Sequence, residues 1–507
     1  MNTIYLYMPP NAKYFSGYFF IKAGYHGKCY NHHCYRKTST PISQFEYKSN
    51  KTALFIIHHP LSNRPAIHLL QMSYFCTTQF QNMKNFIETL RWRGMIHDFT
   101  QGLEEALAKG PVTGYIGFDP TAPSLTIGNY MQVMLLQQFQ LHGHKPVVLM
   151  GGATGRIGDP SGKDKERELK SEEELDKNLN FQKEQFKRLL DFENGSNKAV
   201  FVNNYDFYKD MNVLDFLRKV GKHLTVNYML SKDSVQKRLE TGISFTEFSY
   251  QLLQGYDYYC LYKELGCTLQ MGGSDQWGNI TAGTEFIRRN TQAAEVHALT
   301  SPLLTKSDGK KFGKSEEGNI WLDPKLTSPY KFYQFWLNAD DQDMPKFLKI
   351  FSLKERDEIE SMIMDLATNP NAVKKILAEE LTTRIHSIEA FESAMKVSEL
   401  LFNPKANKDF LLSLTPDQLG DIAGELPNFS ISANVFEEIS IVDLLSGLTS
   451  ICSSKSEARK AIQNQAISIN KRKINSIEEK INKMELVHNQ YLIVENGKKN
   501  KYLIIVN

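Results

Sequence analysis

The chain has 507 residues, a length that suggests about three domains. Its 41% hydrophobic and 23% charged residues are typical of a globular protein with a sizeable core, and no run of eighteen apolar residues offers a transmembrane helix. The formal net charge is +3, but residues 1–82 hold eight Lys and Arg and one acidic residue, Glu46, so the remainder is mildly acidic. Any contact with nucleic acid must therefore depend on local basic patches.

The cysteines are few and scattered, and no two have the paired spacing that would hold zinc. They are Cys29, Cys34, Cys76, Cys260, Cys267 and Cys452. This pattern favours reduced thiols in a cytoplasmic protein, and we predict neither a disulfide framework nor a metal site.

Residues 1–82 differ from the rest of the chain, since they are rich in Tyr, Phe and His and lack sustained periodicity. One interpretation is an organellar targeting segment, but such segments are usually Arg-rich and only Arg36 and Arg64 occur here. The other, which we favour, is upstream sequence translated in frame before a start at Met83. A peptide from before Met83 in the native protein would exclude this second interpretation.

Elements of an α/β domain follow in order. Val112–Phe118 is predicted to be a strand, and 125–142 has helical apolar spacing that stops at Gly143. Val147–Met150 is a short buried strand followed by a glycine turn. The order strand, loop, helix, strand predicts a parallel α/β sheet with a right-handed crossover.

Further along, a charged helix is expected over Lys163–Leu190, alternation of strands and helices continues to about residue 300, and residues 330–425 are mostly amphipathic helix. The stretch Pro427–Asn434 is rich in turn-forming residues and predicts a linker. From Ile441 a short, basic α/β segment completes the chain.

The segment 118–129 connects the first strand to the first long helix. The first turn of a helix has free N–H groups and the positive end of the helix dipole, so it can bind phosphate. Gly128 leaves room for a nucleotide ring, and Thr121, Thr126 and Asn129 offer polar tips. Alone, these residues equally fit a helix cap and close packing.

A second segment, 308–318, places Lys310, Lys311 and Lys314 beside flexible glycines. Such a mobile cationic loop could neutralise charge on a departing pyrophosphate, although a solvated surface loop would have the same composition. A third segment, Gly272–Asn279, is polar and glycine-rich, and it follows an apolar strand at Thr268–Met271.

Together these segments resemble the two signatures of class I aminoacyl-tRNA synthetases, usually His-Ile-Gly-His and Lys-Met-Ser-Lys-Ser. The surrounding sequence is similar to that of the bacterial-type tyrosyl-tRNA synthetases. The segments that carry this resemblance are Tyr115–Asp119, Gly151–Gly162, Val220–Met229, Ser244–Tyr250 and Gly272–Asn279.

The resemblance implies a Rossmann-like catalytic domain over 83–305, a lysine-rich loop and helical anticodon-binding domain over 306–430, and an RNA-binding module over 441–507. It implies an enzyme that activates L-tyrosine with ATP and Mg²⁺, releases pyrophosphate, and transfers tyrosine to tRNA(Tyr). A homodimer without a bound prosthetic group and without membrane contact is expected. Two alternatives are a catalytically weakened RNA-binding paralogue and the related tryptophanyl enzyme.

For tyrosine, the resemblance implies contacts from Tyr115, Asp159, Tyr250, Gln254, Asp257 and Gln276. Tyr250, Gln254 and Asp257 are spaced four and three apart, so one helix face can present all three. Tyr115 and Asp257 can both hydrogen-bond a phenol and would be left unpaired by phenylalanine, a discrimination for which the tyrosyl enzymes are themselves a known example.

For ATP, the resemblance implies Gly117, Asp119, Gly128, Asn129, Gly273, Asp275, Lys314 and Ser315. The residues expected to stabilise the phosphates during the reaction are Thr121, Thr126, Lys311 and Lys314. The reaction needs no protein nucleophile, because positioning and charge stabilisation suffice.

Two residues depart from the family pattern. Asn129 replaces the second His of the first signature and can donate a hydrogen bond much as an imidazole does. Thr126 replaces the first His; its hydroxyl is shorter and never cationic, so we expect Thr126→His to raise the activation rate.

The C-terminal segment resembles a small RNA-binding module. From Ser450 onward it has eleven basic and five acidic residues, which suits phosphate contacts, although a solvated basic face is the alternative. Removal of the chain after Pro427 should spare tyrosine activation and weaken charging of the tRNA. The expected RNA contacts are Lys455, Arg459, Lys460, Lys471, Arg472 and Lys473.

Overall fold

The structure is a computed structural model of the full chain. It describes residues 24–25, 28–29 and 86–507, apart from 162–169, 240–241, 310–311, 316–317, 404–405, 435, 437 and 498–499. The chain divides into two compact units, Met1–Thr77 and Thr78–Asn507. In the first, β1 (Gly24–Tyr25) and β2 (Lys28–Cys29) pair antiparallel. The interpretations of residues 1–82 otherwise lie outside the described residues.

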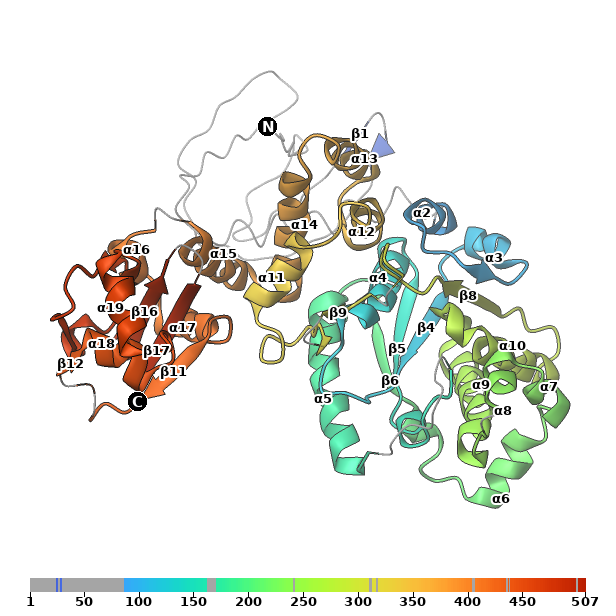
Figure 1. Cartoon of the computed structure of the whole chain (residues 1–507). Coiled ribbons are helices and arrows are strands. Elements are labelled where there is room, and N and C mark those ends of the chain that lie inside the picture. Colours follow the sequence, from blue (N-terminus) through green and yellow to red (C-terminus); the bar gives the residue numbers. More distant parts are fainter. Residues whose placement is uncertain are drawn as a thin grey trace, which may run out of the picture. The chain divides into compact units, whose positions relative to one another are not determined.

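A six-stranded sheet organises residues 98–301, in the order β3-β8-β7-β4-β5-β6 (Figure 1). Its strands are β3 (Asp98–Phe99), β4 (Thr113–Phe118), β5 (Lys145–Met150), β6 (Val200–Asn203), β7 (Cys267–Gly273) and β8 (His297–Ser301). All neighbours pair in parallel except β3, which is antiparallel to β8. The predicted parallel sheet is confirmed. Strand β4 has β5 on one side and β7 on the other, so the strand order reverses at β4. Such a switch point leaves a crevice at the carboxyl end of the strand.

The principal helices around this sheet are α2 (Phe86–Arg93), α3 (Leu103–Lys109), α4 (Ile127–Leu141), α5 (Glu172–Leu189), α9 (Phe245–Leu265) and α10 (Trp277–Asn290). Helix α4 is apolar nearly all round and is correspondingly buried. The helix predicted from Lys163 begins later, at Glu172, because the Ser171 side chain caps its first turn and three glutamates follow there. Residues 163–169 lie outside the described residues.

Residues 329–423 are helical, as predicted. The helices are α11 (Pro329–Leu337), α12 (Met344–Phe351), α13 (Arg356–Asp365), α14 (Pro370–Ile385), α15 (Ile388–Phe402), α16 (Lys408–Leu412) and α17 (Pro416–Ala423). Proline opens or nearly opens α11, α12, α14 and α17, where a missing N–H costs nothing. One apolar core runs from β4 and α4 into these helices. None of the helices in the described part of the chain combines the length and apolarity needed to cross a membrane.

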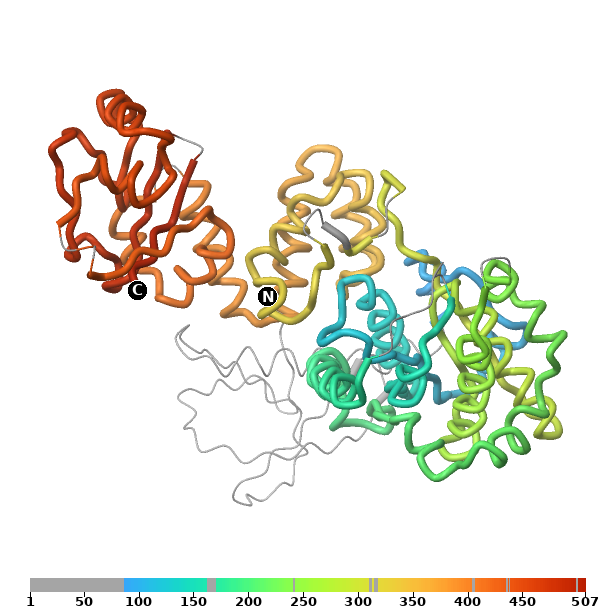
Figure 2. Tube along the Cα trace, turned by 60° about the horizontal axis from the view of Figure 1, so that its bottom comes forward, coloured from blue at the N-terminus to red at the C-terminus, as the bar shows by residue number. Residues whose placement is uncertain are grey.

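The C-terminal module, at the red end of the chain in Figures 1 and 2, has a sheet of its own, in the order β11-β17-β16-β13-β14. The strands are β11 (Asn428–Ile431), β13 (Ile467–Ile469), β14 (Arg472–Lys473), β16 (Tyr491–Asn496) and β17 (Asn500–Val506), with α19 (Lys455–Gln463) beside them. The linker predicted at Pro427–Asn434 is wrong. Asn428–Ile431 pairs in parallel with the last strand, and Ile431 is buried in the core of the module.

Candidate active site

A cavity of about 460 Å³ opens at the carboxyl ends of β4 and β7. Its wall combines the end of β4, the start of α4, one face of α9 and the segment after β7. These elements meet there because the carboxyl ends of parallel strands share one edge of a sheet. The predicted residues that line it are Tyr115, Gly117, Asp119, Thr121, Thr126, Gly128, Asn129, Asp159, Tyr250, Gln254, Asp257, Gly273, Asp275 and Gln276.

One part of the cavity presents a buried phenol and a buried carboxylate. The Tyr115 hydroxyl is fully buried and has no hydrogen-bond partner among the described residues. Asp257 is 1% exposed, and its carboxylate accepts hydrogen bonds from the Asn204 amide at 2.9 Å and the Tyr208 hydroxyl at 2.6 Å. Burial raises the pKa of Asp257 to about 7, against the effect of those two hydrogen bonds. This arrangement can recognise a phenolic hydroxyl in a dry site.

Asn204 and Tyr208 were not predicted from the sequence. Both follow β6 closely, and polar residues directly after a strand of the parallel sheet were the signal that could have found them. The Tyr208 hydroxyl also lies 2.8 Å from the carbonyl of Leu253 on α9, so it ties the end of β6 to the helix that carries Asp257.

Next to the phenol site lies a group of acidic and amide side chains. The Tyr250 hydroxyl donates to Asp119 at 2.9 Å, and Thr154 donates to the other Asp119 oxygen at 2.6 Å. Gln276 donates to Asp159 at 2.6 Å. Burial, followed by the nearby Asp119 and Asp159 carboxylates, raises the pKa of Tyr250 well above its ordinary value. Two carboxylates held this way favour a bound cation such as an ammonium group.

Asp119 therefore connects the residues predicted for ATP with those predicted for tyrosine. The resemblance assigned it to the nucleotide, yet it is bonded to Tyr250, which was assigned to tyrosine. Thr154, which orients Asp119, and Asn279, which lies 3.3 Å from Asp159, were missed because their segments are distant in sequence.

The first turn of α4 is organised by the two residues that depart from the family signature. Thr126 caps the helix, and its hydroxyl donates to the Asn129 side-chain oxygen at 2.8 Å while accepting from the Asn129 backbone N–H at 3.3 Å. The Thr126 N–H donates to the same oxygen at 3.0 Å. This capping box uses the Thr126 hydroxyl proton, so Asn129 Nδ2 is the side-chain donor that the pair can offer to a ligand.

The backbone of the lysine-rich loop contacts this turn. Gly313 has φ +90°, and a Cβ there would lie 2.9 Å from Ile127 Cγ2 and 3.0 Å from the Gly128 nitrogen. The Ile320 N–H donates to the Gly313 carbonyl at 3.0 Å, and the Ile127 N–H donates to the Ile320 carbonyl at 2.9 Å. Lys310, Lys311 and the side chains of Lys314 and Ser315 lie outside the described residues.

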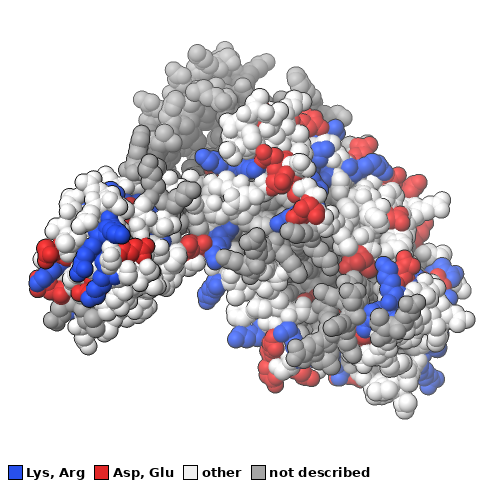
Figure 3. All heavy atoms as spheres, in the orientation of Figure 1, with Lys and Arg blue, Asp and Glu red and all other residues white. Residues whose placement is uncertain are grey.

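The predicted RNA contacts of the C-terminal module lie in two places, on α19 and in the β13–β14 hairpin. Arg459 and Lys460 are exposed on α19, on which Lys455 pairs with Asp443 at 2.7 Å. In the β13–β14 hairpin, Arg472 pairs with two glutamates and Lys473 donates to a backbone carbonyl. Lys and Arg side chains gather on the face of this module that Figure 3 shows, with Asp and Glu beside them.

Lys471 differs from the other predicted RNA contacts, because its charge is paired inside the protein. Its side chain is 9% exposed and pairs with Glu495 at 2.8 Å. Its ammonium also donates to the Leu400 carbonyl at the end of α15, at 3.3 Å. Lys501 donates to the same carbonyl at 3.2 Å. Because its charge is already compensated inside the protein, Lys471 has no reason to face phosphate.

Comparison with known proteins agrees with this geometry. A family model described as tRNA synthetases class I (W and Y) matches residues 107–403, and one described as a tyrosine–tRNA ligase SYY-like C-terminal domain matches 418–505. The tyrosine–tRNA ligase of Cytophaga hutchinsonii is 54% identical over 430 residues, covering 84% of this chain and all of that protein. The chain belongs to the tyrosine–tRNA ligases of class I.

Other tyrosine–tRNA ligases support the same family. That of Bacteroides fragilis is 52% identical over 429 residues, covering 83% of this chain and 99% of its own length. Among solved structures, a C-terminally truncated Aspergillus nidulans mitochondrial tyrosyl-tRNA synthetase superposes with a TM-score of 0.56 at 29% identity, covering 62% of this chain and 94% of that one. The corresponding Coccidioides posadasii enzyme gives 0.55 at 27% identity, covering 65% and 98%.

Proposed function

We propose that this tyrosine–tRNA ligase activates L-tyrosine with ATP in the 460 Å³ cavity and then transfers tyrosine to tRNA(Tyr). The observation that carries the assignment of this cavity is the unpartnered, buried Tyr115 hydroxyl in a pocket that Asp257 also lines. A tyrosine phenol supplies the missing partner of Tyr115 and a further donor for Asp257, whereas phenylalanine leaves the buried Tyr115 hydroxyl unpaired.

The remaining substrate groups follow from this placement of the ring. The tyrosine ammonium is proposed to bind among Asp159, Tyr250 and Gln254, where carboxylates and amides are gathered. Gln276, which bonds Asp159, then lies near the tyrosine carboxylate. That carboxylate attacks the α-phosphorus of ATP, so the protein acts by positioning and by stabilising charge.

ATP with its Mg²⁺ is proposed to lie along the first turn of α4. The adenosine contacts are assigned to Gly117, Asp119, Gly128 and Asn129, with Gly273 and Asp275 near the ribose; all of them line the cavity. Thr121, Thr126, Lys311, Lys314 and Ser315 are assigned to the phosphates. The helix N-terminus supplies fixed positive potential where the triphosphate lies, and the lysines supply mobile charge.

The tRNA is proposed to contact the helical domain, over 306–430, and the C-terminal module. Arg459 and Lys460 are the strongest candidates because both are exposed on one helix. Lys455, Arg472 and Lys473 remain candidates, although Lys455 and Arg472 would have to exchange an internal ion pair for phosphate.

A homodimer is also proposed, because large apolar side chains are exposed between β6 and α9. Val213 and Leu214 on α6 (Val213–Phe216) are 73% and 77% exposed. Neighbouring large apolar side chains exposed on one short helix are typical of an interface. Sedimentation should show a dimer that the paired changes Val213→Asp and Leu214→Asp dissociate; an unchanged dimer would contradict this placement. A cytoplasmic location is proposed from the free cysteines Cys260, Cys267 and Cys452.

The test of the function is tyrosine-dependent exchange of pyrophosphate into ATP by the full chain. Exchange with tyrosine and none with phenylalanine is expected. The alternative of a catalytically weakened paralogue is motivated by Thr126, whose hydroxyl proton is already donated to Asn129. A folded chain that binds tyrosine but catalyses no exchange would establish that alternative.

A further inference from the structure

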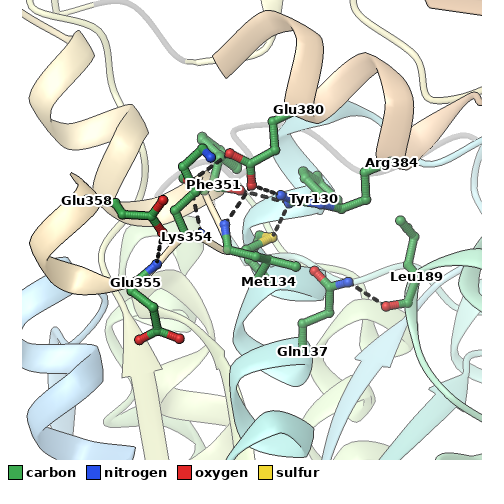
Figure 4. Close-up of polar contacts among 12 residues, drawn as sticks. Tyr130, Met134, Gln137, Leu189, Phe351, Lys354, Glu355, Glu358, Glu380 and Arg384 are labelled. Carbon is green, nitrogen blue, oxygen red and sulfur yellow. Dashed lines mark hydrogen bonds and ion pairs between the residues drawn. The ribbon is translucent and has the colours of Figure 1, made fainter. Parts of the chain in front are cut away.

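A buried arginine of the helical domain contacts the first signature helix. Arg384 on α14 has a side chain that is 14% exposed. One of its terminal nitrogens donates to the Tyr130 hydroxyl at 3.1 Å and to the Phe351 carbonyl at 2.8 Å. Its other terminal nitrogen pairs with Glu380, one turn earlier on α14 (Figure 4). The arginine thus connects α14, α12 and α4 at one point.

Glu380 fixes the arginine by binding the end of α12. It accepts hydrogen bonds from the Ser352 hydroxyl and from the Leu353 N–H, both at 2.7 Å. Arg384 donates a hydrogen bond to the carbonyl of Phe351, the last residue of the same helix. The pair therefore satisfies both a carbonyl and an N–H that would otherwise lie unpaired at a buried helix end. A lysine cannot reproduce this, because it lacks the planar fork that makes parallel bonds.

Tyr130 and Phe351, which Arg384 contacts, pack in the two elements proposed to bind phosphate, the first turn of α4 and the core below the lysine-rich loop. Tyr130 directly follows Asn129 in the first turn of α4 and is fully buried. Its ring stacks on Phe351 with centroids 5.8 Å apart and planes 4° apart. Phe351 in turn stacks on Phe312 of the lysine-rich loop, at 5.5 Å and 25°.

Phe312 is the buried residue of that loop. It is 7% exposed and packs also on Phe347 and Trp336, at 4.9 Å and 5.9 Å between centroids. Its two neighbours in the signature are Lys311 and Gly313, and Gly313 contacts the start of α4. The location of Phe312 therefore sets where the loop leaves the core.

We propose that Arg384, through Tyr130 and Phe351, is a positioning residue for tyrosine activation. It touches no substrate. It fixes the first turn of α4 and the Phe312 anchor relative to each other, so that the helix N-terminus and the loop backbone at Gly313 keep the arrangement that the triphosphate requires. This inference rests on the proposed use of the cavity for tyrosyl-adenylate formation, and it assigns to the helical domain a part in the first chemical step as well as in RNA binding.

The test compares single-turnover adenylate formation with tyrosine binding in the full chain. Tyr130→Phe removes only the hydroxyl that Arg384 binds and keeps the ring on Phe351. We expect the rate of adenylate formation to fall about tenfold, since small displacements of reacting groups cost this much or more. The tyrosine Kd should remain within about twofold, because the tyrosine pocket is built on β4 and α9. Arg384→Lys should lower the same rate further.

Tyr333→Phe is the matched control, because Tyr333 on α11 is also a buried tyrosine and packs on Phe391 of α15. The inference is overturned if Tyr130→Phe and Arg384→Lys form adenylate at the wild-type rate. It is also overturned if tyrosine affinity falls in parallel with the rate, or if Tyr333→Phe shows the same loss. Absence of tyrosine-dependent exchange in the wild-type chain would instead refute the proposed function, so the two failures are distinct.

Discussion

Replacement of Asp257 by asparagine should stabilise the protein while it weakens tyrosine recognition. The carboxylate is 1% exposed, and burial raises its pKa from 3.8 to about 7. A group whose pKa rises on folding contributes most to stability at low pH, and this contribution is lost as the pH rises towards the folded pKa. The 3.8-to-7 shift corresponds to about 4 kcal/mol of destabilisation at pH 8, of which about 1 kcal/mol develops between pH 6 and pH 8.

The asparagine can be accommodated by the existing partners. Its oxygen can face the Asn204 amide, which now donates to the carboxylate at 2.9 Å. Its NH₂ can donate to the Tyr208 hydroxyl, which can turn its own proton to the Leu253 carbonyl at 2.8 Å. The variant therefore removes the charge and keeps the hydrogen bonds to Asn204 and Tyr208.

The assay is urea unfolding at pH 6 and pH 8, together with calorimetric titration of tyrosine. Asp257→Asn should gain stability over the wild type, and the gain should increase by about 1 kcal/mol from pH 6 to pH 8. The tyrosine Kd should rise about tenfold, because a charge-assisted hydrogen bond becomes a neutral one. Asp206→Asn is the control, since its carboxylate is 59% exposed and pairs with Lys209 on the surface. Equal pH dependence in Asp257→Asn and the wild type would refute the reasoning.

Three further outcomes are expected. Thr126→His should raise the rate of adenylate formation about tenfold or more by adding a charged donor, and should cost about 1 kcal/mol of stability because the cap of α4 is lost; a slower variant would contradict it. Gly313→Ala should slow adenylate formation with tyrosine binding unchanged, because its Cβ would lie 2.9 Å from Ile127 Cγ2 at a backbone φ of +90°. Arg459→Ala with Lys460→Ala should leave pyrophosphate exchange intact and lower the salt dependence of tRNA binding by about two in slope; an unchanged slope would exclude these contacts.

The catalytic sheet and much of the cavity could be predicted because their signals are local. The apolar spacing of α4 and the buried run of β5 follow directly from helical and strand periodicity. The four-and-three spacing of Tyr250, Gln254 and Asp257 correctly placed all three on one wall of the cavity. The partners of Asp257 could not be found in this way, since Asn204 and Tyr208 are about fifty residues away in sequence and reach it only through the fold.

Two features of the C-terminal region could not be predicted from the local sequence, and the reason is the same for both. The strand Asn428–Ile431 is short, polar at two of its four positions and paired only with residues some seventy positions later, so its sequence resembles a linker. The basic run after Ile469 suggested a surface patch. Asn470 and Lys471 both have positive φ, at 45° and 67°, and form the two-residue turn between β13 and β14. Charge alone did not reveal that Lys471 points to Glu495 and α15.

The departure at Thr126 makes the positioning network more important. Thr126 is never cationic, and its proton is engaged by Asn129, so charge on the phosphates must be met by the helix N-terminus, Asn129 and the lysine loop. The loop and the first turn of α4 meet through Tyr130 and Phe351. If a histidine took over part of the charge, precise approach of the lysines would matter less. Tyr130→Phe should therefore slow adenylate formation about tenfold in the wild type and only about threefold when combined with Thr126→His. Equal losses in both backgrounds would show that the two groups act independently.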